Sequence, residues 1–345
     1  MGLFSSVDSH LGVDIGNSGI KVVELKKEGR GAKLVSYGFS ENSKLKPGLM
    51  DDVSYAAQLL NKVCNEAGIS NRAAVAALPT YAVFSSILSL SGVTGKDMDS
   101  AVHWEAKKVI PLPLEEMILD WKIIEDPENK DKKNIKVLLT GAPKTLVKKY
   151  VDIFKEAQMN LLSLETETFS LIRSLMGNDK STVMVVEIGD STTDITIADN
   201  GIPSFSRSVD VGGLAVTREI SEKSSMDFEM AEQFKYDLSI VSLLDKESSI
   251  PKVIETLISP IVNEIKYSSN LYQNKSNKKI EKIILSGGSA LLINLPGYLS
   301  KILDKKVIIG DPWNRVAFSE DLKPLLNEVG PKLAVATGLA LRSIY

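Results

Sequence analysis

The feature that most constrains the fold of this chain of 345 residues is a pattern that occurs twice, half the chain length apart. Each copy has an apolar strand, a polar turn that contains glycine, and a second apolar strand: LGVDIGNSGIKVVEL in the first and VMVVEIGDSTTDITI in the second. Aligned on their turns, both copies read carboxylate, Ile, Gly, polar residue and Ser, starting at Asp14 and at Glu187, 173 residues later. A β-turn-β unit repeated at this spacing indicates a duplicated domain.

Each copy is followed by a third strand, which strengthens the case for duplication. The first copy continues through a turn at residues 29–31 into a strand over 33–39. In the second copy, Asn200-Gly201 predicts a type I′ hairpin turn. Residues 51–67 carry apolar side chains at three- and four-residue spacing, which is typical of a helix with one buried face. Cys64 lies on that face and is predicted to be a structural thiol.

The stretch between the two copies matches neither of them. We interpret it as an inserted subdomain of order β-α-β-β-α, which a strand near Leu161 closes. The predicted elements are strands over residues 83–90, 117–125 and 135–140, and helices over 94–109 and 143–159, with a polar turn at 126–134.

The chain after the second copy is predicted to be mostly helical. Helical periodicity covers residues 213–274, followed by a strand at 282–285, a helix at 295–303, a strand at 307–309 and helices at 321–326 and 331–344. At about 150 residues per domain, the length corresponds to roughly two domains with a remainder. We therefore assign residues 10–81, 160–178 and 331–345 to the first domain, 82–159 to the insert and 179–330 to the second domain.

The glycine turns of the two hairpins are candidate phosphate sites. Such a turn directs backbone N–H groups to one side, where they attract an anion, and Ser18 and Ser191 add hydroxyl donors. Asp14 is placed to hold the water shell of Mg²⁺, which prefers one or two carboxylates together with phosphate oxygens. Lys21 can pair with phosphate as a point charge. A single copy is also compatible with an ordinary hairpin turn, but two copies facing each other would clamp a polyphosphate from both sides.

A third glycine turn, Ser286-Gly287-Gly288-Ser289-Ala290, follows a strand and precedes a helix. Glycine pairs at such places mark a tight turn or a ligand that approaches the backbone. The chain has neither a Walker motif nor a G-x-G-x-x-G sequence, so a nucleotide site here is not of the P-loop or Rossmann type. His10, His103 and the one cysteine have no partners at metal-binding spacing.

Composition excludes several classes of partner. Lys and Arg number 41 against 44 Asp and Glu, so the chain has no bulk attraction for nucleic acid. No apolar run approaches the roughly 20 residues that cross a bilayer, and the start lacks the features of a signal peptide. We therefore expect a cytoplasmic protein that does not bind nucleic acid and is not inserted in the membrane.

Taken together, these motifs resemble those of the actin-like ATPase superfamily, which includes actin, sugar kinases and Hsp-type chaperones. The resemblance implies an α/β protein with a duplicated actin-like (RNase H-like) ATPase fold, in which two domains surround a nucleotide cleft. The matching segments are residues 14–18 for the first phosphate motif, 187–192 for the second, 285–290 for the adenosine motif, and 165–175 and 334–341 for the two connecting motifs.

The same resemblance implies which residues bind ATP and Mg²⁺. Asp14, acting through water, and Glu187 are the metal candidates, and Glu187 and Asp194 are the catalytic candidates. The implied nucleotide-binding residues are Gly16, Asn17, Ser18, Lys21, Gly189, Asp190, Ser191, Thr192, Gly212, Gly213, Glu232, Lys235, Gly287, Gly288 and Ser289. The second phosphate motif usually carries Asp where this chain has Glu187, one methylene longer. Because reacting geometry is sensitive to such displacements, we expect nucleotide binding with at most a weak ATPase activity.

Two further segments resemble the PilM family of type IV pilus assembly proteins, to which FtsA of cell division is related. They are Ala77-Leu78-Pro79 through Phe84, and the stretch HWEAKKVIPLP at residues 103–113. The resemblance covers about residues 10–345 and implies that the insert is the FtsA/PilM-type subdomain. It also implies a cytoplasmic protein that is peripheral to the inner membrane and binds the N-terminal cytoplasmic tail of a PilN-like membrane protein. Pilus motor ATPases and further copies of the chain are additional implied partners.

Two other functions remain open at this point. An FtsA-like filament protein would need a basic amphipathic tail, whereas this sequence ends at Tyr345, directly after the second connecting motif. A small-molecule kinase of the same fold would need an acceptor pocket and a base that takes a hydroxyl proton. Asp194 is the nearest candidate for that base.

Overall fold

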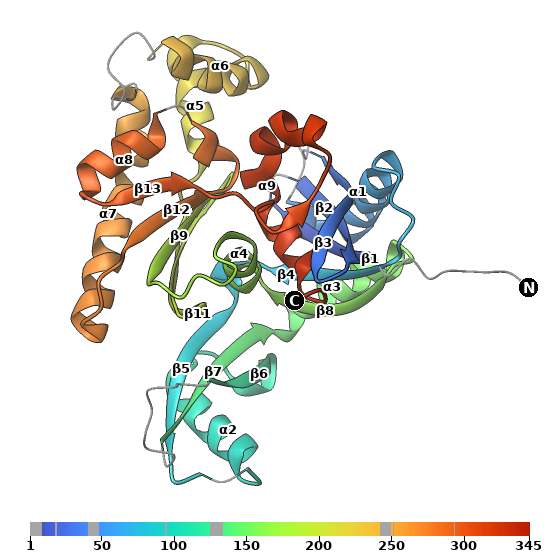
Figure 1. The fold of residues 1–345 in the computed structure, drawn as a ribbon, viewed down its shortest axis with the longest axis vertical. Coiled ribbons are helices and arrows are strands. Elements are labelled where there is room, and N and C mark those ends of the chain that lie inside the picture. The colour runs from blue at the N-terminus through green and yellow to red at the C-terminus, as the bar shows by residue number, and fades with distance from the viewer. Residues whose placement is uncertain are drawn as a thin grey trace, which may run out of the picture.

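Two sheets of similar topology, each covered by helices, dominate the computed structural model (Figure 1). The structure describes residues 9–17, 19–40, 48–93, 95–124, 134–241, 250, 252–292 and 294–345. The first sheet has the order β14-β3-β2-β1-β4-β8. Its strands are β1 (Ser9–Gly16), β2 (Gly19–Glu28), β3 (Gly31–Phe39), β4 (Ala73–Leu78), β8 (Asn160–Thr166) and β14 (Val316–Ala317).

The second sheet repeats the core of the first. Its order is β11-β10-β9-β12-β13, and the first three strands in sequence are antiparallel neighbours while β12 runs parallel to β9. β1, β2, β3 and β4 have the same arrangement, so the predicted duplication is confirmed. The strands are β9 (Val183–Ile188), β10 (Thr193–Asp199), β11 (Ile202–Val209), β12 (Lys282–Ser286) and β13 (Lys306–Ile309). Asn200 and Gly201 both have positive φ, as the predicted type I′ turn requires.

Helices cover both sheets. In the first domain, α1 (Val53–Glu66) and α3 (Lys144–Glu156) share one apolar core with the inner strands, and Cys64 is buried there with a pKa raised to about 11, chiefly by burial. In the second domain, Ile195, Ile258 and Leu285 belong to one core. The second-domain helices are α5 (Gly213–Ser224), α6 (Phe228–Val241), α7 (Lys252–Ser276) and α8 (Leu295–Leu303).

Two helices join the domains where the sheets meet. They are α4 (Glu167–Leu175) and α9 (Lys323–Leu341), and they cross at Gly338. A Cβ at Gly338 would lie less than 3.0 Å from the carbonyl oxygen, C and Cα of Ser170, so the backbones touch there. The crossing therefore depends on the missing side chain.

The prediction of two helices at 321–326 and 331–344 is wrong, because α9 continues through Pro331 after a short 3₁₀ turn, Glu320–Leu322. Proline removes one helical hydrogen bond. Separately, the carbonyl oxygen of Pro331 accepts bonds from the Gly287 N–H at 3.0 Å and the Ser286 hydroxyl at 3.1 Å, which tie the helix to the third glycine turn. Burial of the helix on both sides of the proline, at Leu326 and Leu333, keeps it in one piece.

The insert contains fewer packed elements than predicted. A three-stranded sheet of order β5-β7-β6 is covered on one face by α2 (Met98–Val109). Its strands are β5 (Phe84–Ser91), β6 (Met117–Ile124) and β7 (Asn134–Pro143). α3 packs on the first domain instead, and β8 does not close the insert but pairs with β4. Most of the predicted polar turn at 126–134 lies outside the described residues.

Residues near the end of the range assigned to the second domain also lie against the first. β14 pairs with β3, and Trp313 and Leu326 belong to a core that includes Val23 and Leu25 of β2. Among the described residues, four further 3₁₀ turns are Leu49–Asp51, Thr80–Ala82, Leu114–Glu116 and Gly288–Leu291. Among the residues that the structure describes, no helix combines the length and the apolar character that crossing a lipid bilayer demands.

Candidate functional site

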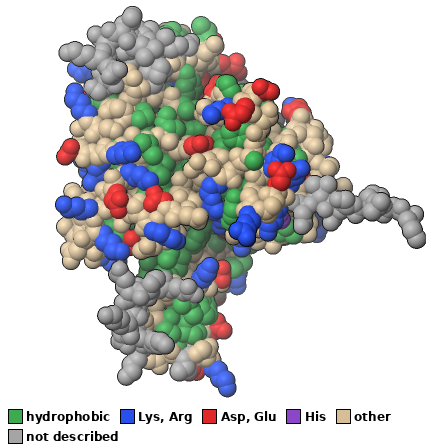
Figure 2. All heavy atoms as spheres, in the orientation of Figure 1, with side chains coloured by type: hydrophobic (Ala, Val, Ile, Leu, Met, Phe, Trp, Pro, Cys, Tyr) green, Lys and Arg blue, Asp and Glu red, His purple; other side chains and the backbone are tan. Residues whose placement is uncertain are grey.

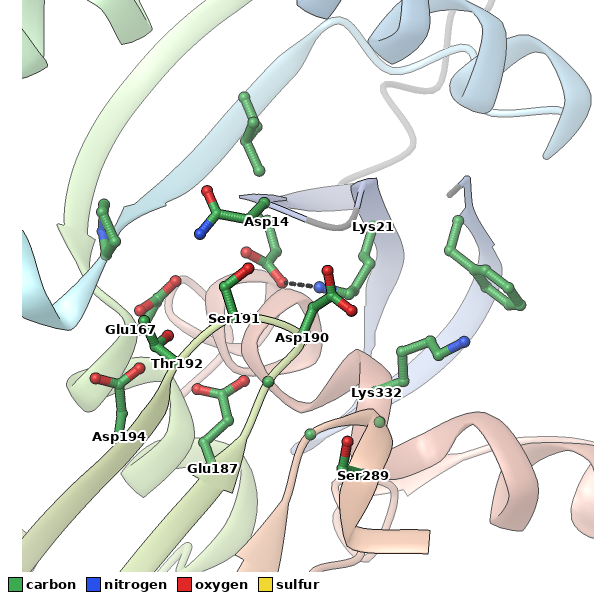
Figure 3. A pocket seen from close by; sticks show the side chains of 18 of the residues that line it. Asp14, Lys21, Glu167, Glu187, Asp190, Ser191, Thr192, Asp194, Ser289 and Lys332 are labelled. Atoms are coloured by element: carbon green, nitrogen blue, oxygen red, sulfur yellow. Dashed lines mark hydrogen bonds and ion pairs between the residues drawn. The ribbon is translucent and has the colours of Figure 1, made fainter. Parts of the chain in front are cut away.

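A cleft lies between the two hairpin turns and holds about 1120 Å³ of empty space, part of it open to solvent. Most of the predicted site residues line it, with the two turns facing each other (Figure 3). Those that line it are Asp14, Gly16, Asn17, Lys21, Glu187, Gly189, Asp190, Ser191, Thr192, Asp194, Glu232, Lys235, Gly287, Gly288 and Ser289.

Two predicted residues, Gly212 and Gly213, lie behind the second turn rather than on the cleft wall. The Gly213 N–H donates to the Gly189 carbonyl oxygen at 2.9 Å. A Cβ on Gly212 would come within 3.0 Å of Gly189 and Asp190, and one on Gly213 would collide with the hydroxyl of Ser289. Both glycines therefore support the turn by close packing. Ser18, the remaining predicted residue, lies outside the described residues.

The first hairpin brings a base and an acid together. Asp14 on β1 is paired in register with Lys21 on β2, and Lys21 Nζ lies 3.0 Å from Asp14 Oδ2. Burial alone lowers the pKa of Lys21, but the charge and the hydrogen bond of Asp14, together with the charges of Glu187 and Glu167, outweigh it, so the pKa is raised. Lys21 therefore stays charged within the cleft, next to the turn that carries Gly16 and Asn17.

The second hairpin has two acids at the equivalent positions. Glu187 on β9 is paired in register with Asp194 on β10. Glu167, the first residue of α4, joins them, and one carboxylate oxygen of each lies within 4.8 Å of the others. Burial and then the charges of Asp194 and Asp14 raise the pKa of Glu187 to about 8. Burial raises the pKa of Asp194 to about 6, against a hydrogen bond from Ser208.

Glu167 is a site residue that the sequence reasoning did not single out, although it lies in the first connecting motif. Its Oε2 accepts hydrogen bonds from the Thr80 N–H at 2.8 Å and the Thr80 hydroxyl at 3.3 Å. Burial and the charges of Glu187, Asp14 and Asp194 raise its pKa well above the usual range. The sequence signal that could have identified Glu167 is a carboxylate on the first turn of the helix that follows β8.

The other end of the cleft has no acid cluster among the described residues. Phe39 at the end of β3 and Lys332 on α9 face each other there, with Lys332 Nζ 4.9 Å from the ring centre. Gly287 has φ +84°, and a Cβ there would collide with the backbone of Ile188, so this turn packs directly on the end of β9. No sequence motif identifies Phe39 or Lys332 as a site residue, because the two reach the cleft from separate elements.

Glu232 and Lys235 on α6 reach the same cleft as a pair. Lys235 is 1% exposed, and its Nζ lies 2.8 Å from Glu232 Oε1 and 3.1 Å from Thr217 Oγ1. Its charge is therefore neutralised by a neighbour on its own helix, which suits a buried lysine. Glu232 also accepts a hydrogen bond from the Thr217 hydroxyl, so α5 and α6 are held together beside the cleft.

The raised pKa values predict that the ligand-free protein loses stability as the pH rises. The folded state binds more protons than the unfolded state between the ordinary pKa of Glu187, 4.5, and its folded value of about 8. Stability conferred by that proton is complete below pH 4.5 and disappears as the pH passes about 8. We expect the melting temperature measured by calorimetry to fall between about pH 5 and pH 9, and Glu187→Gln to reduce the slope and raise stability at the alkaline end.

Asp179→Asn is the matched control for this prediction. Hydrogen bonds from Lys282 and Ser181 hold the pKa of Asp179 at about 2, so it does not titrate in that interval. Asp179→Asn should lower stability without changing the slope. A melting temperature that rises with pH in the wild type, or an unchanged slope in Glu187→Gln, would contradict the prediction.

Comparison with known proteins gives a family match along almost the whole chain. Residues 12–344 match the family model described as type IV pilus assembly protein PilM. Cell division protein FtsA of Neisseria meningitidis serogroup B is 21% identical over 374 residues, covering 95% of this chain and 88% of that protein.

Two solved structures show the fold. The structure described as the PilM-PilN type IV pilus biogenesis complex superposes with a TM-score of 0.85 at 23% identity, covering 97% of this chain and 98% of that one. MreB 5 of Spiroplasma citri bound to AMPPNP superposes with a TM-score of 0.53 at 14% identity, covering 96% and 95%. These likenesses confirm the predicted actin-like ATPase fold.

Proposed function

The chain belongs to the PilM family of type IV pilus assembly proteins, and we propose that it binds ATP with Mg²⁺ in the cleft and the cytoplasmic tail of a PilN-like inner-membrane protein on its insert. The observation that carries the nucleotide half is the pair of hairpin turns facing each other across the cleft. Their backbone N–H groups suit phosphates. The AMPPNP bound to MreB 5, which shares the fold, supports the same ligand class.

The acidic cluster fits a divalent cation. Glu167, Glu187 and Asp194 repel one another at close range, which adds to burial in raising the pKa values of Glu167 and Glu187. A hard cation with oxygen ligands would relieve that repulsion, and Asp14 would add a contact through water. When bound, Mg²⁺ would neutralise phosphate charge. Lys21 and the two glycine turns would position the phosphates.

Hydrolysis is a lesser part of the proposal. A general base must be unprotonated at the working pH. With a pKa of about 8, Glu187 carries a proton at neutral pH in the ligand-free protein, and Asp194, with a pKa of about 6, is the better base. Asp194 is held by the hydroxyl of Ser208, which fixes its orientation. We therefore propose nucleotide binding as the main activity, with slow turnover through Asp194 and Glu187.

The partner half of the proposal rests on the insert. Figure 2 shows hydrophobic side chains gathered on it, at the bottom of the view. The side chains of Trp104 and Leu112 are 65% and 50% exposed, and Ile118 and Ile123 on β6 are 45% and 47% exposed. Ile118 and Ile123 lie on opposite faces of the sheet because side chains alternate along a strand, so the insert exposes large apolar side chains on both faces, which favours a role in protein binding. The PilN in the PilM-PilN complex supports a membrane protein of that type as the occupant.

Calorimetry with a synthetic PilN tail tests the partner half, with and without Mg-ATP. We expect Trp104→Ala to weaken tail binding by tenfold or more, since exposed tryptophans at interfaces are frequent hot spots worth about 2 kcal/mol. Tyr267→Ala is the matched control, because Tyr267 is a similarly exposed aromatic residue, 52% exposed, on α7 of the second domain. If the wild-type chain does not bind the tail under either condition, this half of the proposal fails.

A further inference from the structure

Tyr150 on α3 combines deep burial with an unused hydroxyl. The residue is 1% exposed, and its ring packs with Ile153 and Phe154 in the core of the first domain. Within the described part of the chain, nothing forms a hydrogen bond with its hydroxyl. Tyr150 also lines the cleft. The hydroxyl is thus an unpaired donor at the wall of a ligand cleft, where a bound ligand can supply the acceptor.

The hydroxyl lies at the acidic end of the cleft. Burial, followed by the negative charges of Glu167 and Asp14, raises the pKa of Tyr150 well above its usual value. The side chain therefore remains protonated at every physiological pH and is available as a donor. The negative charges around it indicate that its natural acceptor arrives with a cation.

The two ends of the cleft differ in a way that orients the ligand. One end has the carboxylates that suit a metal ion, and the other has Phe39, Lys332 and the Gly287-Gly288 turn. Mg²⁺ binds nucleotides through phosphate oxygens. The phosphate chain therefore points toward the carboxylates, and the last phosphate comes nearest to Glu167 and Tyr150.

We propose that the Tyr150 hydroxyl donates a hydrogen bond to the terminal phosphate of a nucleoside triphosphate, which makes it the residue that distinguishes a triphosphate from a diphosphate. This inference rests on the proposed nucleotide binding. It adds a specificity residue from an element, α3, that contains none of the motif segments. A diphosphate leaves the hydroxyl without an acceptor, whereas a triphosphate supplies one.

The test is Tyr150→Phe in the full chain, with affinities for AMPPNP and ADP measured by calorimetry in the presence of Mg²⁺. We expect affinity for AMPPNP to fall roughly ten- to hundredfold, as for loss of a hydrogen bond to a charged group, and affinity for ADP to change less than about twofold. The melting temperature of the ligand-free variant should be unchanged or higher, because no protein partner is lost. Tyr272→Phe, at a buried tyrosine in the second-domain core, should leave both affinities unchanged.

Several results would overturn the inference. An equal loss of affinity for both nucleotides, or no loss for either, shows that Tyr150 does not read the terminal phosphate. A lower melting temperature of the ligand-free Tyr150→Phe protein shows that the hydroxyl has a structural role instead. If the wild-type chain binds neither nucleotide, the proposed function fails together with the inference, and this outcome is distinct because it appears before any substitution.

Discussion

Replacing Gly338 by alanine should destabilise the protein by about 3 kcal/mol or more, a large share of the roughly 5–15 kcal/mol by which native proteins are stable. In an ordinary helix, Gly→Ala stabilises by about 1 kcal/mol, so the expected sign is reversed. The reason is that the added Cβ would lie less than 3.0 Å from three backbone atoms of Ser170 on α4. Backbone cannot move aside as a flexible side chain can, so the two helices that join the domains would have to separate.

Chemical denaturation of Gly338→Ala and the wild type measures this loss. Gly95→Ala is the control, because a Cβ at Gly95 would meet no atom within 4 Å and its φ is not positive. That variant should differ from the wild type by less than about 0.5 kcal/mol. A Gly338→Ala protein as stable as Gly95→Ala would show that α4 and α9 do not approach as closely as the structure has them.

Replacing Asp14 by asparagine should reduce the affinity for Mg-ATP by about ten- to a hundredfold, the range found when an outer ligand of a metal site is lost. Asparagine keeps the size of the side chain but removes the charge beside Lys21, which lies 3.0 Å away. Lys21 then remains as a partly buried cation without its partner, which also lowers stability. Titration calorimetry with ATP, first in Mg²⁺ and again in EDTA, separates the loss of the metal contact from the loss of the Lys21 ion pair. Only the measurement in Mg²⁺ includes the metal.

A control for this substitution lies on the same hairpin. Glu28→Gln breaks an ion pair with Lys33 of 3.2 Å, in which both side chains are about half exposed. Exposed pairs contribute little, so nucleotide affinity and stability should both remain near the wild-type values. Unchanged Mg-ATP affinity in Asp14→Asn would remove Asp14 from the metal site, and an equal loss in EDTA would assign it a role in binding that does not involve the metal.

The duplicated hairpins were predictable because their information is local. Alternating apolar residues and glycine turns specify strands and reversals within about 15 residues, and α8 has the predicted bounds, Leu295–Leu303. The misassigned elements depend on distant partners. α9 continues through Pro331 because Leu326 and Leu333, on either side of the proline, are buried in one core with residues of β2. The carbonyl of Pro331 also receives bonds from Ser286 and Gly287, 45 and 44 residues earlier in the chain.

The same distinction, between local sequence information and contacts with distant segments, separates the site residues that the sequence reveals from those that it does not. Asp14, Gly189 and Gly288 lie in motifs that indicate a turn. Tyr150 and Glu167 reach the cleft from α3 and α4, and an amphipathic helix does not reveal which sheet it will cover. For the same reason the sequence pattern places α3 in the insert, whose last strand directly precedes it, although the helix packs against α1.

The matching registers of the two hairpins have a consequence for how a ligand enters. Asp14 faces Lys21 in one copy, and Glu187 faces Asp194 in the other, at positions 173 residues apart in both cases. If the two copies were identical and related by a twofold axis, the cleft would accept an asymmetric ligand in two opposite directions. The exchange of a lysine for an acid at one position of the pair breaks that symmetry, so divergence after duplication gave the cleft a polarity.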